Sequence, residues 1–129
     1  MKQSKIRISQ SEWEIMEVLW SRSPLSAAEI FGELEHMTTW NNKTVRSFLD
    51  RLEQKAAVFK KKAHGINVFE PAIKREKCLR MESSSFLSRF FKGNPVSMMA
   101  HFIEREELSD DDIKRLQKLL KSKKHNNEG

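Results

Sequence analysis

The sequence predicts a mainly α-helical chain: an α+β winged helix-turn-helix with a two-stranded wing, followed by a C-terminal helical dimerisation region. Two capping boxes predict two short helices, a basic amphipathic segment predicts a third, and two β-type segments flanking Gly65 predict the wing. After Pro71 the apolar residues recur only at helical spacing. We therefore expect a DNA-binding domain at 1–72, a dimerisation domain at 73–124 and a disordered tail at 125–129.

The first two helices each begin at a capping box. Ser9 is followed three residues later by Glu12, and Ser26 by Glu29, so that serine and glutamate side chains satisfy backbone N–H groups of the first turn. The Ser-Pro pair ending at Pro24 should terminate the first helix. The apolar residues after each cap have helical spacing: Trp13, Met16, Leu19 and Trp20 in the first helix, and Ile30, Phe31 and Leu34 in the second.

The third predicted helix, roughly residues 41–57, is both amphipathic and basic. Its apolar residues fall on one buried stripe, at i, i+3, i+4 and i+7: Val45, Phe48, Leu49 and Leu52. Because the opposite side is polar and basic, this helix can pack along one side and enter a DNA major groove with the other. The side chains suited to contact base edges there are Lys43, Thr44, Arg46 and Ser47.

A short hairpin follows this helix and should lie beside the groove as a wing. Its first strand contains three consecutive lysines, and its turn is expected at residues 63–65. Side chains alternate in direction along a strand, so at most two of these lysines can face the DNA backbone together. Two asparagines at the start of the third helix are also suited to cap it. The predicted phosphate contacts are Asn41, Asn42, Arg51, Lys55, Lys60, Lys61 and Lys62.

Positive charge is concentrated in the segment that carries these candidates. The chain has a net charge of +6 and a pI of about 9.6. Residues 8–40 hold six glutamates and one basic side chain, a net charge of −5, whereas residues 41–65 hold seven basic and two acidic side chains, a net charge of +5. Such a distribution is what a nucleic-acid-binding surface requires, although a solvated basic face would give it too.

The C-terminal part should form helices that pair with a second subunit. Gly93-Asn94-Pro95 separates two helical segments, and a run of aspartates from Asp110 begins a last helix. These helices are rich in apolar residues but too few to enclose a core alone, so we expect a homodimer. The predicted dimerisation residues are Leu79, Phe86, Phe90, Met99, Phe102, Ile103, Ile113, Leu116 and Leu120.

Several other classes of protein are disfavoured. The single cysteine, Cys78, excludes an intramolecular disulfide and a cysteine-rich metal site, and neighbouring cations should lower its pKa. The histidines share no ligand spacing, and neither a nucleophile–base pair nor a glycine-rich phosphate loop is evident. No apolar run is long enough to span a membrane. We expect a cytoplasmic, non-enzymatic protein without a metal or cofactor and without membrane insertion.

With these elements placed, the sequence resembles the penicillinase-repressor family of BlaI/MecI type. The matching segments cover nearly the whole chain, and the Thr-Trp…Lys-Thr-Val element is the most specific: residues 8–20, 39–52, 68–71, 85–93, 97–98 and 107–113. The resemblance implies a homodimeric repressor on a palindromic operator with TACA/TGTA half-site cores. It also implies control of a β-lactamase or resistance transpeptidase operon. By matching position, Lys43, Thr44, Arg46 and Ser47 become base contacts and Arg51 a phosphate contact.

The resemblance further implies a mode of release. In the family, a membrane sensor-protease that detects β-lactam leads to cleavage within the dimerisation region, here between His101 and Phe102. The sequence departs from the family at this point, because the relatives place asparagine where this chain has His101. The wing glycine is displaced by one residue, and Ala56 replaces the usual helix-ending glycine.

Two alternatives remain open from the sequence. A winged helix can be a protein-interaction module whose basic helix meets an acidic partner. A DNA-binding winged helix can also be released by a ligand bound between its C-terminal helices instead of by proteolysis. A band shift separates the first alternative from DNA binding, and mass spectrometry after incubation with a cognate protease separates the second from cleavage.

Overall fold

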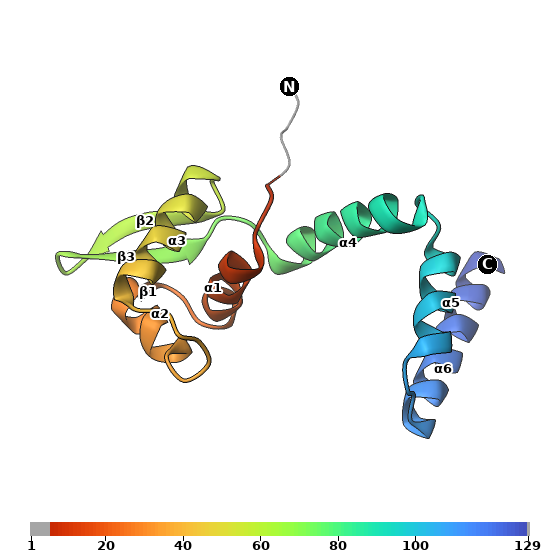
Figure 1. Cartoon of the computed structure of the whole chain (residues 1–129). Helices are drawn as coiled ribbons and strands as arrows, with labels where there is room; N and C mark the ends of the chain where they lie inside the picture. Colours follow the sequence, from red (N-terminus) through yellow and green to blue (C-terminus); the bar gives the residue numbers. More distant parts are fainter. Residues whose placement is uncertain (1–5, 129) are drawn as a thin grey trace. The chain divides into compact units, whose positions relative to one another are not determined.

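A computed structural model describes residues 6–128 of the chain (Figure 1). It confirms the predicted winged helix-turn-helix followed by C-terminal helices. The chain divides into two compact units, residues 1–84 and 85–129, which are described separately. The elements are α1 (Gln10–Ser21), β1 (Leu25–Ser26), α2 (Ala27–Leu34), α3 (Asn42–Gln54), β2 (Val58–Ala63), β3 (Ile66–Pro71), α4 (Arg75–Phe91), α5 (Pro95–Arg105) and α6 (Asp110–Glu128).

Both predicted capping boxes are present. The Ser9 backbone N–H donates to Glu12 Oε1 at 2.9 Å, and the Glu12 N–H donates to Ser9 Oγ at 3.2 Å. The same reciprocal pair joins Ser26 and Glu29, with distances of 2.8 and 3.2 Å. These four hydrogen bonds fix where α1 and α2 begin, because they satisfy backbone donors that no helical carbonyl reaches.

The end of α3 differs from the prediction, because the helix stops at Gln54 instead of Ala57. Ala56 adopts a left-handed conformation with φ of 63°. The Ala57 N–H then donates to the Leu52 carbonyl at 2.9 Å and the Ala56 N–H to the Glu53 carbonyl at 3.0 Å. This is a Schellman motif, which closes the helix and turns the chain directly into β2.

The wing belongs to a three-stranded antiparallel sheet in the order β1-β3-β2. The sequence predicts only two strands, but Leu25 pairs with Phe69 and is itself buried, which makes β1 a third strand. The turn between β2 and β3 contains two residues of positive φ, His64 at 53° and Gly65 at 79°. Two successive left-handed residues are the geometry of a type I′ turn, whose twist suits a hairpin.

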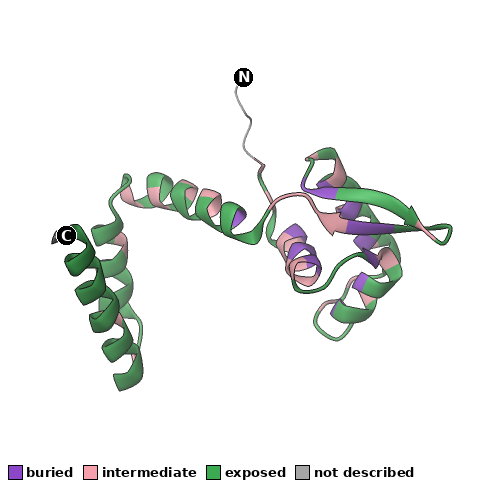
Figure 2. Ribbon diagram, turned by 180° about the vertical axis from the view of Figure 1, so that it is seen from behind, coloured by how far each residue is buried: buried purple, intermediate pink, exposed green. Residues whose placement is uncertain are grey.

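The hydrophobic core of the first unit lies where α1, α2 and α3 meet the sheet (Figures 1 and 2). The stripe of α3 predicted from the sequence points into this core, and the apolar sides of α1 and α2 face it. Partly buried aromatic residues close its margin. The core residues are Ile15, Met16, Leu19, Leu25, Ile30, Leu34, Val45, Leu49, Leu52, Ala57, Val58 and Phe69.

The first turns of α4 belong to the winged-helix unit, so the predicted domain boundary at 72/73 lies too early. Trp20 Nε1 donates to the Ile73 carbonyl at 2.9 Å, and the Arg75 guanidinium donates to both carboxylate oxygens of Glu17 at 2.9 and 3.2 Å. The Arg75 hydrogen bonds lower the pKa of Glu17. Cys78 is buried, and burial raises the pKa of its thiol, contrary to the sequence-based expectation.

The second unit contains the last turns of α4 together with α5 and α6, which run side by side in opposite directions (Figure 1). Asn94 caps α5, accepting hydrogen bonds from the next turn, and Ser109 and Asp112 form a further reciprocal cap at the start of α6. The predicted tail differs, because α6 continues through residues 125–128; Gly129 lies outside the described residues. Lysines near its C-terminal end favour this extension through the helix dipole.

Across residues 6–128, every helix is either too short or too polar to cross a membrane.

Candidate nucleic-acid interface

The outward side of α3 carries the side chains that the sequence proposes for base contacts. Val45 and Leu49 are completely buried, and Phe48 lies half-buried against Trp40 with ring centroids 5.0 Å apart. The opposite side is exposed at Lys43, Arg46 and Ser47, whereas Thr44 is half-buried. The structure therefore brings three of the four candidate base contacts onto one exposed helix surface, with Thr44 half-buried beside them.

Asn41 is the N-cap of this helix. Its Oδ1 accepts a hydrogen bond from the Thr44 backbone N–H at 2.9 Å and from Thr44 Oγ1 at 3.0 Å. The cap fixes the start of α3 and the orientation of the Thr44 hydroxyl, so that the Thr44 methyl group is also held in place. Asn41 and Asn42 both remain exposed beside the candidate base contacts, and their predicted phosphate contacts stay predictions.

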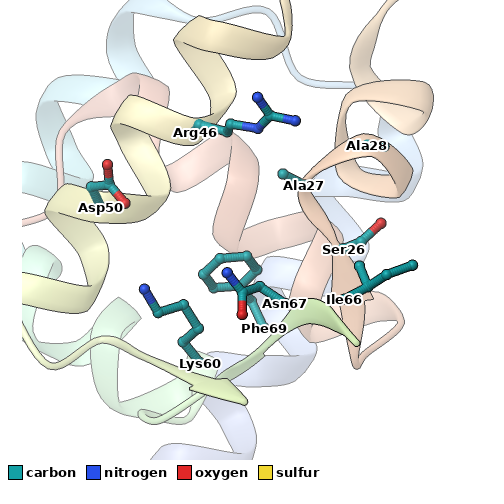
Figure 3. Close-up of a pocket in the computed structure, with 9 residues that line it drawn as sticks. All are labelled: Ser26, Ala27, Ala28, Arg46, Asp50, Lys60, Ile66, Asn67 and Phe69. Carbon is teal, nitrogen blue, oxygen red and sulfur yellow. The ribbon is translucent and has the colours of Figure 1, made fainter. Parts of the chain in front are cut away.

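A groove of about 440 Å³ lies between α3, the start of α2 and the wing strands β2 and β3 (Figure 3). Its polar side chains come from β1, α3, β2 and β3 and face a common space, while small side chains of α2 leave that space open. The lining residues are Ser26, Ala27, Ala28, Arg46, Asp50, Lys60, Ile66, Asn67 and Phe69. The groove extends the accessible side of α3 towards the wing.

Sequence reasoning missed Asn67 and Asp50 as members of this surface. Asn67 is two residues before the buried Phe69 on β3 and pairs with Lys62 across the hairpin, so strand alternation places it on the groove side. Strand alternation in the sequence could have identified it. Asp50 is evident as an outward residue of α3, but only the folded wing shows that it faces the groove.

The three wing lysines divide between the two sides of the hairpin. Lys60 and Lys62 share the side of the sheet that carries Phe69, whereas Lys61 lies on the other side. Lys60 Nζ lies 3.3 Å from Glu53, and Lys61 Nζ lies 2.7 Å from Glu70. The side chains of these ion pairs are 32% to 57% exposed, so each pair contributes little to stability and leaves the lysine available for a phosphate.

Lys55 makes contacts within the fold, and its predicted phosphate contact stays a prediction. Its ammonium group donates to the Glu12 carboxylate and to the Arg7 carbonyl, the latter at 2.6 Å. Glu12 is completely buried and requires this cation. Burial raises the pKa of Glu12, but the hydrogen bonds from Lys55 and Ser9 and the charge of Lys55 together outweigh burial and lower it. Lys55 therefore anchors the end of α3 to the start of α1.

Arg51 lies on the flank of α3. Its guanidinium group is 5.7 Å from the centroid of the Phe48 ring, which places the planar cation over an aromatic face. The residue is exposed and keeps its donors accessible. Its predicted phosphate contact is compatible with this position but stays a prediction.

The predicted dimerisation residues are exposed or half-buried within the described residues. Leu79 lies in the first unit, and the other eight lie in the second unit. Phe90 is 57% and Leu120 is 60% exposed, values that are high for large apolar side chains of a single folded chain. The His101–Phe102 peptide bond lies inside α5, and both residues are exposed; the His101 ring lies 5.8 Å from that of Phe91.

Comparison with known proteins decides the family. The penicillinase repressor family matches residues 8–122, which is most of the sequence. This chain belongs to the penicillinase repressor family. It is 34% identical over 119 residues to the penicillinase repressor of Bacillus licheniformis, covering 92% of this chain and 93% of that protein. It is also 30% identical over 123 residues to the methicillin resistance regulatory protein MecI of Staphylococcus aureus strain N315, covering 95% of this chain and 100% of that protein.

Solved structures agree with the family assignment in the winged-helix part. The DNA-binding domain of the repressor BlaI is 35% identical, with a TM-score of 0.50, over 57% of this chain and 90% of that chain. Bacillus licheniformis BlaI, solved as a monomeric form in complex with the blaP half-operator, is 36% identical, with a TM-score of 0.50. The match covers 56% of this chain and 89% of that chain. Because these penicillinase repressor relatives are transcription regulators, the prediction of a regulator and not an enzyme is confirmed.

Proposed function

We propose that this chain is a homodimeric, sequence-specific repressor that binds a palindromic operator of a β-lactamase or resistance-type operon. The observation that carries the proposal is α3, which buries one side completely and exposes Lys43, Arg46 and Ser47 on the other. In this proposal α3 enters the major groove and the wing lies beside the groove. The protein then acts in the cytoplasm, where the DNA is. The names of the relatives, penicillinase repressor and methicillin resistance regulatory protein, support the class of operon.

Base contacts and phosphate contacts come from different elements in this proposal. Lys43, Thr44, Arg46 and Ser47 contact base edges, where lysine and arginine donate to guanine and the threonine methyl group packs on thymine. Arg51 and the wing lysines neutralise phosphates and fix the register of the protein on the duplex. Asn41 and Asn42, at the start of α3, add uncharged contacts to the same backbone.

The second unit supplies the homodimer in this proposal. Its exposed apolar residues would be covered by the same residues of a second copy, and two winged helices would then reach two half-sites of one duplex. Linking two winged-helix domains makes the second binding event intramolecular, so the dimer binds the full operator far more tightly than a half-site. This arrangement requires a palindromic operator because the two subunits are identical.

Release is proposed to follow cleavage of the His101–Phe102 bond by a membrane sensor-protease. A cut there divides α5 and separates α6 from the rest of the chain, so most of the proposed dimerisation surface is lost while α3 and the wing stay intact. Because the bond lies within a helix, local opening of α5 must precede cleavage. The exposure of both residues supports access by a protease.

A band-shift assay on the DNA upstream of its own gene tests DNA binding. We expect retardation with a log–log salt slope of roughly −5 to −9, since about 6–10 phosphates are neutralised per dimer. Lys43→Ala should relax base preference at one position, whereas the matched change Lys61→Ala should weaken binding uniformly on all sequences. Equal losses on operator and random DNA for both variants would refute this division, and no retardation of any palindromic duplex would favour a protein-interaction module.

Incubation with a cognate sensor-protease, followed by mass spectrometry, tests the mode of release. A fragment ending at His101 together with loss of operator binding supports cleavage. An intact chain that nevertheless leaves the operator supports release by a directly bound ligand and contradicts the proposed proteolysis.

A further inference from the structure

Asp50 is a carboxylate on a basic surface, and no ion pair compensates it among residues 6–128. Residues 41–70 contain three acidic side chains, and two of them hold wing lysines: Glu53 binds Lys60 and Glu70 binds Lys61. Asp50 is exposed and has no salt bridge to any of the described residues. It therefore differs from its two acidic neighbours, whose charges are already compensated within the fold.

The position of Asp50 brings it to the proposed DNA surface. It lies one turn after Arg46 on the same side of α3, and both residues line the groove between α3, α2 and the wing (Figure 3). Because Ser47 is small and exposed on the adjoining surface, α3 can approach a base edge closely enough for a short aspartate side chain to reach it. Asp50 thus faces the open groove that it shares with Lys60 of the hairpin, on the side of α3 that is proposed to contact DNA.

A carboxylate on this surface is repelled by phosphates, so it lowers affinity for DNA in general unless a donor meets it. The major groove offers two amino donors, cytosine N4 and adenine N6. Adenine presents the N7 acceptor beside N6, which repels a carboxylate, whereas cytosine presents N4 alone. We propose that Asp50 is a specificity-determining residue of α3 that accepts a hydrogen bond from the N4 amino group of a cytosine in each operator half-site.

This inference rests on the proposed DNA binding and makes it more specific. Arg46 and Asp50 are separated by about 6 Å along the helix axis, which corresponds to roughly two base steps of the duplex. The cytosine that Asp50 contacts therefore lies within about two base pairs of the base that Arg46 contacts. The carboxylate excludes operators that place an acceptor at that position, and so it adds selectivity at the expense of general affinity.

The test measures the full-length protein and its Asp50→Ala variant on duplexes in which each half-site base pair is replaced in turn, and on random DNA. The variant should lose discrimination at one C·G pair by about 5- to 100-fold, the range typical of a single base contact. It should also bind random DNA several-fold more tightly, because one repulsive charge is removed. Asp50→Asn should move the preference at that pair from cytosine towards adenine, since an amide both donates and accepts.

Glu53→Ala is the matched control. It removes the same charge from the same helix three residues later, but Glu53 is already paired with Lys60 and does not line the groove. This control should tighten binding to random DNA without changing preference at any base pair. Circular dichroism spectra should confirm that all three variants are folded.

Two results would overturn the inference. If Asp50→Ala changes affinity by the same factor on every duplex, Asp50 acts only through its charge or by supporting α3. If preference changes at a pair whose contacted base is not cytosine, the assigned donor is wrong. Failure of the wild-type protein to retard any duplex would instead remove the proposed DNA binding itself, so the two failures are distinguishable.

Discussion

At the scale of single residues, Glu12 connects the beginning of α1 to the end of α3. One of its carboxylate oxygens accepts hydrogen bonds from the Ser9 N–H and the Lys55 ammonium group, and the other has no partner among the described residues. A buried charge with one uncompensated oxygen depends strongly on its cation. Lys55 therefore supports the helix that carries the proposed base contacts.

Replacing Lys55 with methionine should make stability depend on pH with a distinctive sign. In the wild-type protein the pKa of Glu12 is lowered, so its contribution is present above the ordinary value of 4.5 and is lost as the pH falls through the folded pKa. Without Lys55, burial dominates and raises that pKa, so protonation relieves the buried charge. The variant should be about 2 kcal/mol less stable at pH 7, and this difference should shrink as the pH is lowered towards 4.

Urea unfolding followed by tryptophan fluorescence measures this difference, because all three tryptophans, Trp13, Trp20 and Trp40, lie in the first unit. Lys60→Met is the control, since both side chains of its ion pair with Glu53 are more than a third exposed, and it should change stability by less than about 1 kcal/mol at any pH. A Lys55→Met destabilisation that is the same at pH 7 and pH 4 would show that the lost packing of the lysine stem, not its charge, matters.

The sequence predicts a phosphate contact for Lys55 because charge and helical position are all that a linear pattern shows. Glu12 lies 43 residues away from it, and no local spacing connects the two. The stripe of Val45, Leu49 and Leu52 is predicted correctly because helical periodicity is a local property. Sequence reasoning therefore misses roles that depend on a distant partner, such as the contact of Lys55 with Glu12.

At the scale of elements, the junction between α3 and β2 carries local backbone strain. Ala56 holds a φ of 63°, a left-handed conformation that disfavours every side chain with a Cβ atom. Two Schellman hydrogen bonds hold it there, so the fold tolerates the strain to bring Val58 into the sheet directly after the helix. The strain lies between the proposed base-contacting helix and the wing, where rigidity sets their relative position.

Ala56→Gly should therefore stabilise the protein by about 1 kcal/mol, because glycine adopts the left-handed conformation without the Cβ penalty. The residue is exposed, so no packing is lost. Urea unfolding measures this change in the free energy of unfolding directly. The matched substitution Gln54→Gly, at the last helical residue, should have the opposite sign and lower stability by up to about 1 kcal/mol. A destabilised Ala56→Gly variant would contradict the assignment of strain.

The sequence predicts elements well where their signals are local, and less well where they depend on pairing. The capping boxes at Ser9 and Ser26 are recognisable from four residues each. Strand β1 is only two residues long, and its existence depends on pairing with β3, more than forty residues later, so no alternation could reveal it. The contacts of Trp20 and Glu17 with the start of α4 are likewise distant in the sequence, so no local pattern could reveal that the first compact unit continues beyond residue 72.

At the scale of the whole molecule, the two units differ in how completely each encloses its apolar residues. The first unit buries a core of twelve residues. In the second unit, Phe90, Ile103 and Leu120 are 57%, 49% and 60% exposed, and their helices hold no comparable core within the described residues (Figure 2). Large apolar side chains in contact with water carry a free-energy cost that a second copy would remove. The core of the first unit contains no residue of the second unit, so a change in the second unit should leave the first unit folded.

Phe90→Glu should convert the proposed dimer to a monomer without unfolding the first unit. A charge at that position cannot be buried against a second copy without a large desolvation penalty. Sedimentation should give a single subunit at micromolar concentration, and tryptophan fluorescence should be unchanged. The variant should bind an operator half-site with the affinity of the wild-type protein. Its affinity for the full palindrome should fall by about 10²-fold or more, because the two winged-helix domains are no longer linked.

The control is Ser88→Glu, which places the same charge on an exposed polar position of the same helix and should leave the dimer intact. If Phe90→Glu remains dimeric, the subunits associate through another surface. If it becomes monomeric but still binds the palindrome as tightly as the wild-type protein, the linkage of two winged-helix domains does not determine the affinity for the operator. In that case cleavage of the second unit could not release the repressor, because separating the subunits would leave each α3 on its half-site at full occupancy.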